Sequence, residues 1–169
     1  MLNLKSVIGA SLFAVSAMAA SSAFAYAPLN STSTTAFGPT TLSYIGQNVP
    51  CHSAFTIHVD AAGAATITAA SFTQGTGDSS FCPSITANSL PWTIGTASYV
   101  AGSGTPGSYT APVSGVSVTV PGLHVTCTGS VTITLNDTLG VASFSGTLHN
   151  GAIACGVSGT GLNTSVTAP

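Results

Sequence analysis

The chain has 169 residues, of which one is basic (Lys5), three are aspartates, four are histidines and none is a glutamate. Charged side chains make up 2% of it, so it lacks both the Lys/Arg clusters that bind phosphate backbones and the carboxylates that serve most acid–base catalysis. This composition argues against nucleic-acid binding and against most enzymatic chemistry.

The segment 1–25 has the pattern of a secretory signal peptide. A short n-region ends at Lys5, an apolar stretch follows, and Ala23-Phe24-Ala25 forms a small-x-small cleavage site. We expect cleavage between Ala25 and Tyr26 and export through the Sec pathway, across the periplasm, to the outside or the cell surface. The apolar stretch is short for a membrane span, so we expect no transmembrane segment after signal removal. An uncleaved anchor helix is the alternative.

The exported part, residues 26–169, has no lysine or arginine, and 44 of its 144 residues are serine or threonine. Its length suits one domain with a proper core. We expect a flexible Ser/Thr-rich arm over 26–37 and a single domain over 38–169. The surface of this domain is solvated by neutral hydroxyls, and it lacks the charge repulsion that keeps most soluble proteins apart.

Alternation with a period of two residues predicts strands. Apolar residues alternate with threonine, serine or histidine over 55–59, 116–120 and 131–135, which places an aliphatic face inward and a hydroxyl face outward. Turn signals rich in Gly, Pro, Asn and Asp separate such runs, and Ala101–Ala111 is expected to be a long loop. The predicted fold is all-β: a single antiparallel β-sandwich, or a flattened barrel, with two disulfides, after an N-terminal signal helix.

Four cysteines in an exported chain predict two disulfides, with three possible pairings. Cys51 and Cys127 each precede an apolar-Thr-Ile-x-apolar strand, a turn with Asp or Asn, a returning strand with phenylalanine, and a second cysteine. This similarity suggests two duplicated halves, 38–100 and 112–169, and it favours the pairs Cys51–Cys82 and Cys127–Cys155. Chance similarity between Thr/Val-rich strands is the alternative.

The sequence gives little support for a catalytic site or a metal site. His58 and Asp60 share a strand face, but no G-x-S-x-G elbow accompanies them, and Asp60 stands where a turn needs an Asp or Asn. The four histidines have no zinc-ligand spacing. Trp92, the single tryptophan, is either an apolar anchor or a plug of the core. We predict no catalytic residue, no metal and no cofactor.

The sequence resembles a small family of secreted bacterial proteins, the protein-like activators of alkane oxidation. The resemblance rests on the signal peptide, the charge-poor Ser/Thr-rich exported part, the four cysteines, and the segment Cys82-Pro-Ser-Ile followed by Leu90-Pro91-Trp92-Thr. It covers most of residues 36–169. It implies a non-enzymatic helper for growth on long-chain hydrocarbons, which disperses oil or modifies the cell surface, also in biofilm and matrix contexts.

Three functional hypotheses follow. In the first, the protein is a secreted accessory to alkane oxidation that acts at an oil–water, lipid or cell-surface interface, with self-association as a further possibility. In the second, it is a structural subunit of a surface filament or biofilm matrix, because strand edges without lysine favour edge-to-edge pairing. In the third, it is a secreted hydrolase, which needs a histidine beside an activated nucleophile, or a carbohydrate-binding β-domain, which needs several exposed aromatic side chains.

Overall fold

A computed structural model describes residues 25–28, 31–101 and 107–168, with the backbone alone for residues 32–34. The signal segment, up to residue 24, lies outside the described residues. The strands are β1 Ser31–Tyr44, β2 Gln47–Val59, β3 Ala65–Thr73, β4 Thr86–Asn88, β5 Trp92–Ile94, β6 Ser98–Tyr99, β7 Ser108–Val120, β8 Val125–Asn136, β9 Val141–Asn150 and β10 Ile153–Thr164. Two short 3-10 helices, η1 (Cys82–Ser84) and η2 (Pro121–Leu123), connect strands.

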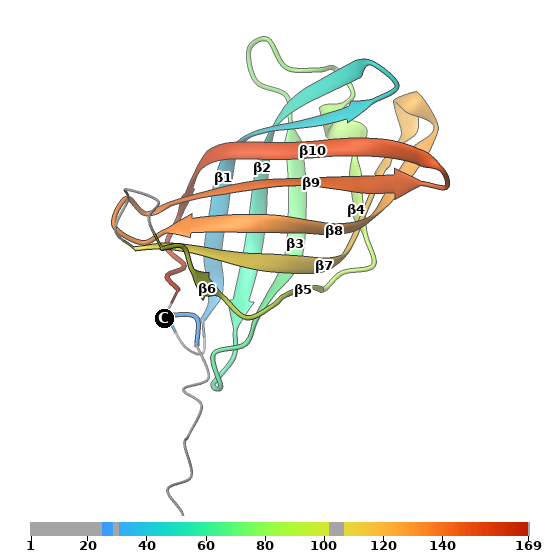
Figure 1. Ribbon diagram of the computed structural model, residues 1–169. Coiled ribbons are helices and arrows are strands. Elements are labelled where there is room, and N and C mark those ends of the chain that lie inside the picture. The colour runs from blue at the N-terminus through green and yellow to red at the C-terminus, as the bar shows by residue number, and fades with distance from the viewer. Residues whose placement is uncertain (1–24, 29–30, 102–106, 169) are drawn as a thin grey trace, which may run out of the picture.

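Eight of these strands close into an antiparallel barrel. The order is β7-β5-β3-β2-β1-β10-β9-β8, and β8 pairs back with β7. In Figure 1, β7 to β10 cross the view in front of β1 to β3, which run at a steep angle behind them. The short strands β4 and β6 pair only with β7.

The fold is therefore a closed barrel, which the sequence analysis gave as the alternative to a sandwich. The closure depends on β5, which has three residues and joins β3 to β7. A run this short, directly after Pro91, carries no alternation pattern by which the sequence could identify it as a strand.

The predicted alternation is confirmed in the strands themselves. Phe55, Ile57 and Val59 of β2 are buried, and Val116, Val118 and Val120 of β7 are buried as well. Threonines of the outward faces, such as Thr132, are exposed. An antiparallel sheet with one buried face requires this pattern, because successive side chains point to opposite faces.

The expectation of a flexible arm over 26–37 differs from the structure. Residues from Ser31 onward belong to β1, which pairs with both β2 and β10. Tyr26 is buried, and Ala27 forms a β-bridge with Thr167. Threonine favours extended backbone, and hydrogen bonds to two neighbours hold this strand despite its weak hydrophobic pattern. The expected loop over 101–111 likewise gives way to β7 at Ser108.

Two disulfides fasten the barrel, and all four cysteines take part in them. Cys51 of β2 is bonded to Cys82 of η1, and Cys127 of β8 is bonded to Cys155 of β10. These are the pairs that the internal similarity favours. The second bond spans β9, because β9 pairs with both β8 and β10.

The two halves match in their turns and differ in their second cysteines. Asp60 accepts hydrogen bonds from the backbone N–H groups of Ala62 and Ala64, and Asn136 accepts one from Leu139. Cys82, however, lies in a 3-10 helix, whereas Cys155 lies in a strand. The duplication remains a hypothesis.

Candidate functional site

His52 and His58 lie six residues apart on β2, His124 follows η2 and His149 lies on β9. His58 Nδ1 is 3.0 Å from the carbonyl oxygen of Ser31, and Asp60 is occupied with its own turn, so the two do not form a catalytic pair. His124 and His149 are exposed on different elements. Among the described residues, no group of three or more His, Cys, Asp or Glu side chains is placed to hold a metal ion.

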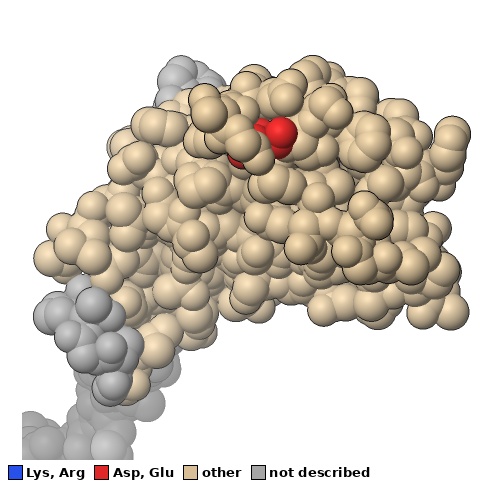
Figure 2. Space-filling view, turned by 90° about the horizontal axis from the view of Figure 1, so that it is seen from above, with Lys and Arg blue, Asp and Glu red and all other residues tan. Residues whose placement is uncertain are grey.

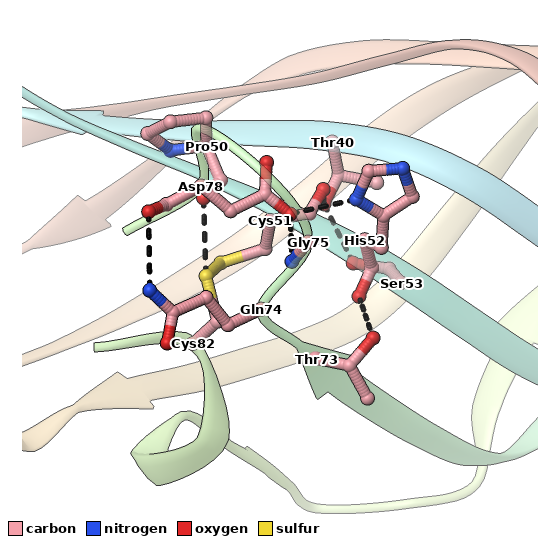
Figure 3. Close-up of polar contacts among 10 residues, drawn as sticks. All are labelled: Thr40, Pro50, Cys51, His52, Ser53, Thr73, Gln74, Gly75, Asp78 and Cys82. Carbon is pink, nitrogen blue, oxygen red and sulfur yellow. Dashed lines mark hydrogen bonds and ion pairs between the residues drawn. A yellow bond between two sulfur atoms is a disulfide. The ribbon is translucent and has the colours of Figure 1, made fainter. Parts of the chain in front are cut away.

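One imidazole does meet a carboxylate, although the sequence analysis did not anticipate it. His52 Nδ1 lies 2.6 Å from Asp78 Oδ2, and the same oxygen accepts a 2.8 Å hydrogen bond from the backbone N–H of Gly75 (Figure 3). The hydroxyl of Thr73 donates to the backbone carbonyl of His52 and so does not face the imidazole. The contact closes the turn after β3.

Asp78 should titrate below its ordinary range. The hydrogen bond from His52, followed by that from Gly75, lowers the pKa of the Asp78 carboxyl. Because folding lowers this pKa, the contact stabilises the fold above about pH 4, and that contribution is lost as the pH falls through the folded-state pKa.

We expect His52→Thr to raise the pKa of Asp78 toward its ordinary value in a carboxyl NMR titration. The control substitution His149→Thr should leave the pKa of Asp78 unchanged. If the pKa of Asp78 does not rise in His52→Thr, the assignment of His52 as the cause of its lowering is contradicted.

Figure 3 also shows the contact between Cys82 and Pro50. The Sγ of Cys82 lies 3.0 Å from the carbonyl oxygen of Pro50. A disulfide sulfur carries no hydrogen, so this is a close S···O contact and not a hydrogen bond. It places η1 against the start of β2.

Trp92 belongs to the core. Its side chain is buried and its Nε1–H donates to the carbonyl oxygen of Asn88. Tyr26 is similar: its hydroxyl donates to the carbonyl oxygen of Gly95, and burial raises its pKa to about 12. Both aromatic groups therefore have their polar atoms satisfied inside the protein, as buried Tyr and Trp require.

The outer surface is almost free of charge. Seen from above the view of Figure 1, the described surface shows one small group of acidic atoms and no basic ones (Figure 2). Threonines on the outward strand faces, such as Thr35, Thr132 and Thr160, are exposed on it. Such a surface is wetted by hydroxyls, with little electrostatic repulsion between neighbouring molecules.

Large apolar side chains are exposed at both ends of the barrel, and Phe37 (52% exposed) is exposed within β1. At one end are Ile45 (67% exposed) in the β1–β2 turn, Ile153 (42%) where β10 begins, and Phe81 (37%) beside η1. We call these three residues the apolar end. At the opposite end are Leu139 (65%) and Tyr99 (60%).

The two ends differ in charge. The aspartate of the apolar end, Asp78, is paired with His52. Asp60 and Asp137 lie in turns at the opposite end, and their printed contacts are hydrogen bonds from backbone N–H groups. The opposite end thus has two carboxylates and the apolar end has one, and moving a carboxylate into an apolar medium is costly, so the apolar end is the better suited to contact oil.

No helix among the described residues is long and apolar enough to cross a membrane. This finding concerns helices alone.

Comparison with protein families matches residues 1–168 to the family described as alkane oxidation protein activator PraA/PraB-like. No curated protein and no solved structure matches the chain. The match covers almost the whole sequence and agrees with the resemblance drawn from the cysteines and the Leu90-Pro91-Trp92 segment. The chain therefore belongs to the PraA/PraB-like alkane oxidation protein activator family.

Proposed function

We propose that this protein is an exported, non-enzymatic accessory of alkane oxidation that adsorbs where a hydrocarbon or an apolar cell surface meets water. The observation that carries the proposal is the combination of a nearly uncharged hydroxyl surface with three exposed apolar side chains at one end of a rigid barrel. The family description supports the hydrocarbon context.

Adsorption through the apolar end makes a specific prediction. Ile45 and Ile153 together expose roughly one isoleucine side chain, which is worth about 2 kcal/mol when it leaves water, or about thirtyfold in an adsorption constant. We expect Ile45→Ser/Ile153→Ser to weaken adsorption to a hexadecane–water interface by that factor, measured from the isotherm of interfacial tension against protein concentration.

The opposite end supplies the matched control. Leu139 and Tyr99 together have a larger exposed fraction than Ile45 and Ile153. They lie at the end of the barrel whose turns contain Asp60 and Asp137, and the control variant is Leu139→Ser/Tyr99→Ser. We expect the adsorption constant of this variant to fall less than threefold. Equal losses in the two double variants would show that adsorption does not depend on the apolar end.

The role in growth is tested separately. Deletion of the gene should slow growth on hexadecane and leave growth on succinate unchanged. Complementation with the Ile45→Ser/Ile153→Ser variant should restore growth less well than the wild-type gene. Equal growth defects on both carbon sources would contradict a role in hydrocarbon use.

The alternative, a filament or matrix subunit built by edge-to-edge strand pairing, receives less support from the geometry. Most of the long strands are paired on both sides in the closed barrel, and the free edges in the described part of the chain are those of the two- and three-residue strands β6 and β4 and of residues 68–73 of β3, which pair with β2 alone. Short edges are poor templates for pairing between molecules. Electron microscopy of the secreted fraction decides this: regular fibres would favour the alternative.

A further inference from the structure

The barrel encloses a cavity of about 110 Å³. Side chains from all eight barrel strands line it, and nearly all of them are aliphatic or aromatic, with Trp92 forming part of the wall. An eight-stranded barrel is just wide enough for its side chains to fill, or to hold one small ligand. Here the filling is incomplete.

The cavity wall has few polar side chains. They are Thr40, Thr41, Ser143 and Thr164. The hydroxyl of Thr40, the buried residue among them, is already paired: it lies 2.6 Å from that of Ser53 and 3.3 Å from the carbonyl oxygen of Cys51. Every buried side-chain nitrogen or oxygen among the described residues has a hydrogen-bond partner. A water molecule in a cavity needs two to four polar partners, so a wall this apolar favours an apolar ligand over water. Empty apolar space of this kind takes up apolar ligands.

The side chains that line the cavity are spread along the barrel. Ala142 and Leu148, which both line it, are six residues apart on β9, or about 20 Å along a strand. A volume of about 110 Å³ distributed over that span fits a chain better than a ring. It is smaller than the cavity of about 150 Å³ that holds benzene in another protein.

We propose that this cavity is a binding site for an unbranched alkyl chain, either a short n-alkane or the terminal methylenes of a longer one. The inference goes beyond the interfacial role and does not depend on it, because a dissolved chain binds inside the barrel whether or not the outer surface adsorbs to oil. Each methylene that enters the cavity tightens binding about fourfold. The gain stops when the cavity is full.

The single tryptophan gives a direct assay. Because Trp92 is a wall residue and is buried, a bromoalkane in the cavity should quench its fluorescence, whereas bromide ion in solution should not. The probes are 1-bromobutane, 1-bromohexane and 1-bromooctane, each below its solubility so that no oil phase is present. We expect saturable quenching at one molecule per protein, with an affinity that rises with chain length and then levels off.

Two variants fill the space from different walls. Ala142→Leu on β9 and Ala36→Leu on β1 should each weaken 1-bromohexane quenching at least tenfold. The control Ala69→Leu makes the same change at an exposed position of β3 and should bind like wild type. Circular dichroism checks that each variant is folded.

The outcomes separate the two proposals. Quenching that is linear in bromoalkane and insensitive to chain length would overturn the cavity site, and this result needs no variant. Folded cavity-filled variants that still bind would overturn it as well. Unchanged interfacial adsorption in the isoleucine variants, together with saturable quenching, would contradict the interfacial proposal and support the cavity site.

Discussion

Replacing Cys127 and Cys155 with alanine is expected to lower the free energy of unfolding by about 3–4 kcal/mol. The bond closes a loop of 28 residues, and the chain-entropy model gives about 3.6 kcal/mol for that length. Both cysteines are fully buried, so lost packing adds to the effect. The total free energy of unfolding of a domain is about 5–15 kcal/mol, so the variant should be marginally stable. Urea denaturation of the oxidised wild-type and variant proteins measures the difference.

The first disulfide is the internal comparison. Cys51–Cys82 closes a loop of 31 residues, so its entropic contribution is nearly the same. It differs in what it holds, because it fastens η1 rather than two long strands. We expect Cys51→Ala/Cys82→Ala to lose similar stability and also to speed hydrogen exchange around η1. A loss below about 1 kcal/mol in the Cys127 and Cys155 variant would contradict a structural role for that bond.

Leu148→Ala is expected to cost about 3–5 kcal/mol of unfolding free energy. Leu148 is fully buried on β9, packs over Gly129 of β8, and lines the barrel cavity. The new void joins space that is already empty, so the surrounding side chains have little means to close it, which places the cost in the upper part of the usual range. Thermal and urea unfolding measure the loss.

The matched control for Leu148→Ala is Leu139→Ala. Leu139 is 65% exposed in the β8–β9 turn, so the same substitution should change stability by less than about 0.5 kcal/mol. Similar losses at both positions would show that Leu148 does not occupy the tight core position described here.

The strands were predictable where one face is buried. The alternation over 55–59, 116–120 and 131–135 identifies β2, β7 and β8, because burial on one face leaves a period of two in the sequence. β1 and β5 were not predictable. β1 is weakly patterned and held by pairing on both sides, and β5 is too short to show a period. Closure of the barrel depends on β5, so alternation alone could not distinguish a sandwich from a barrel.

The surface could be foreseen, but the particular contacts could not. Absence of charge follows directly from composition. The contact between His52 and Asp78, in contrast, joins residues 26 positions apart and depends on how the chain turns after β3. The apolar end was missed because Ile45 and Ile153 look like core residues in the sequence, although both stand where a hairpin turns. Only the register between β1 and β10, in which Tyr44 pairs with Cys155, brings those two turns together.

The most direct test concerns the uncharged surface. Five exposed positions on five strands, Thr35, Thr93, Thr132, Thr147 and Thr160, are replaced by lysine in one variant and by glutamine in another. Saturation coverage of a hexadecane–water interface is then measured at low salt and at about 1 M salt, where the screening length falls to about 3 Å. We predict dense films from the wild-type and glutamine proteins at both salt concentrations, and sparse films from the lysine protein that become dense only at high salt. Equal coverage by the lysine and glutamine variants at low salt, or wild-type coverage no greater than that of an ordinary charged globular protein, would contradict the account.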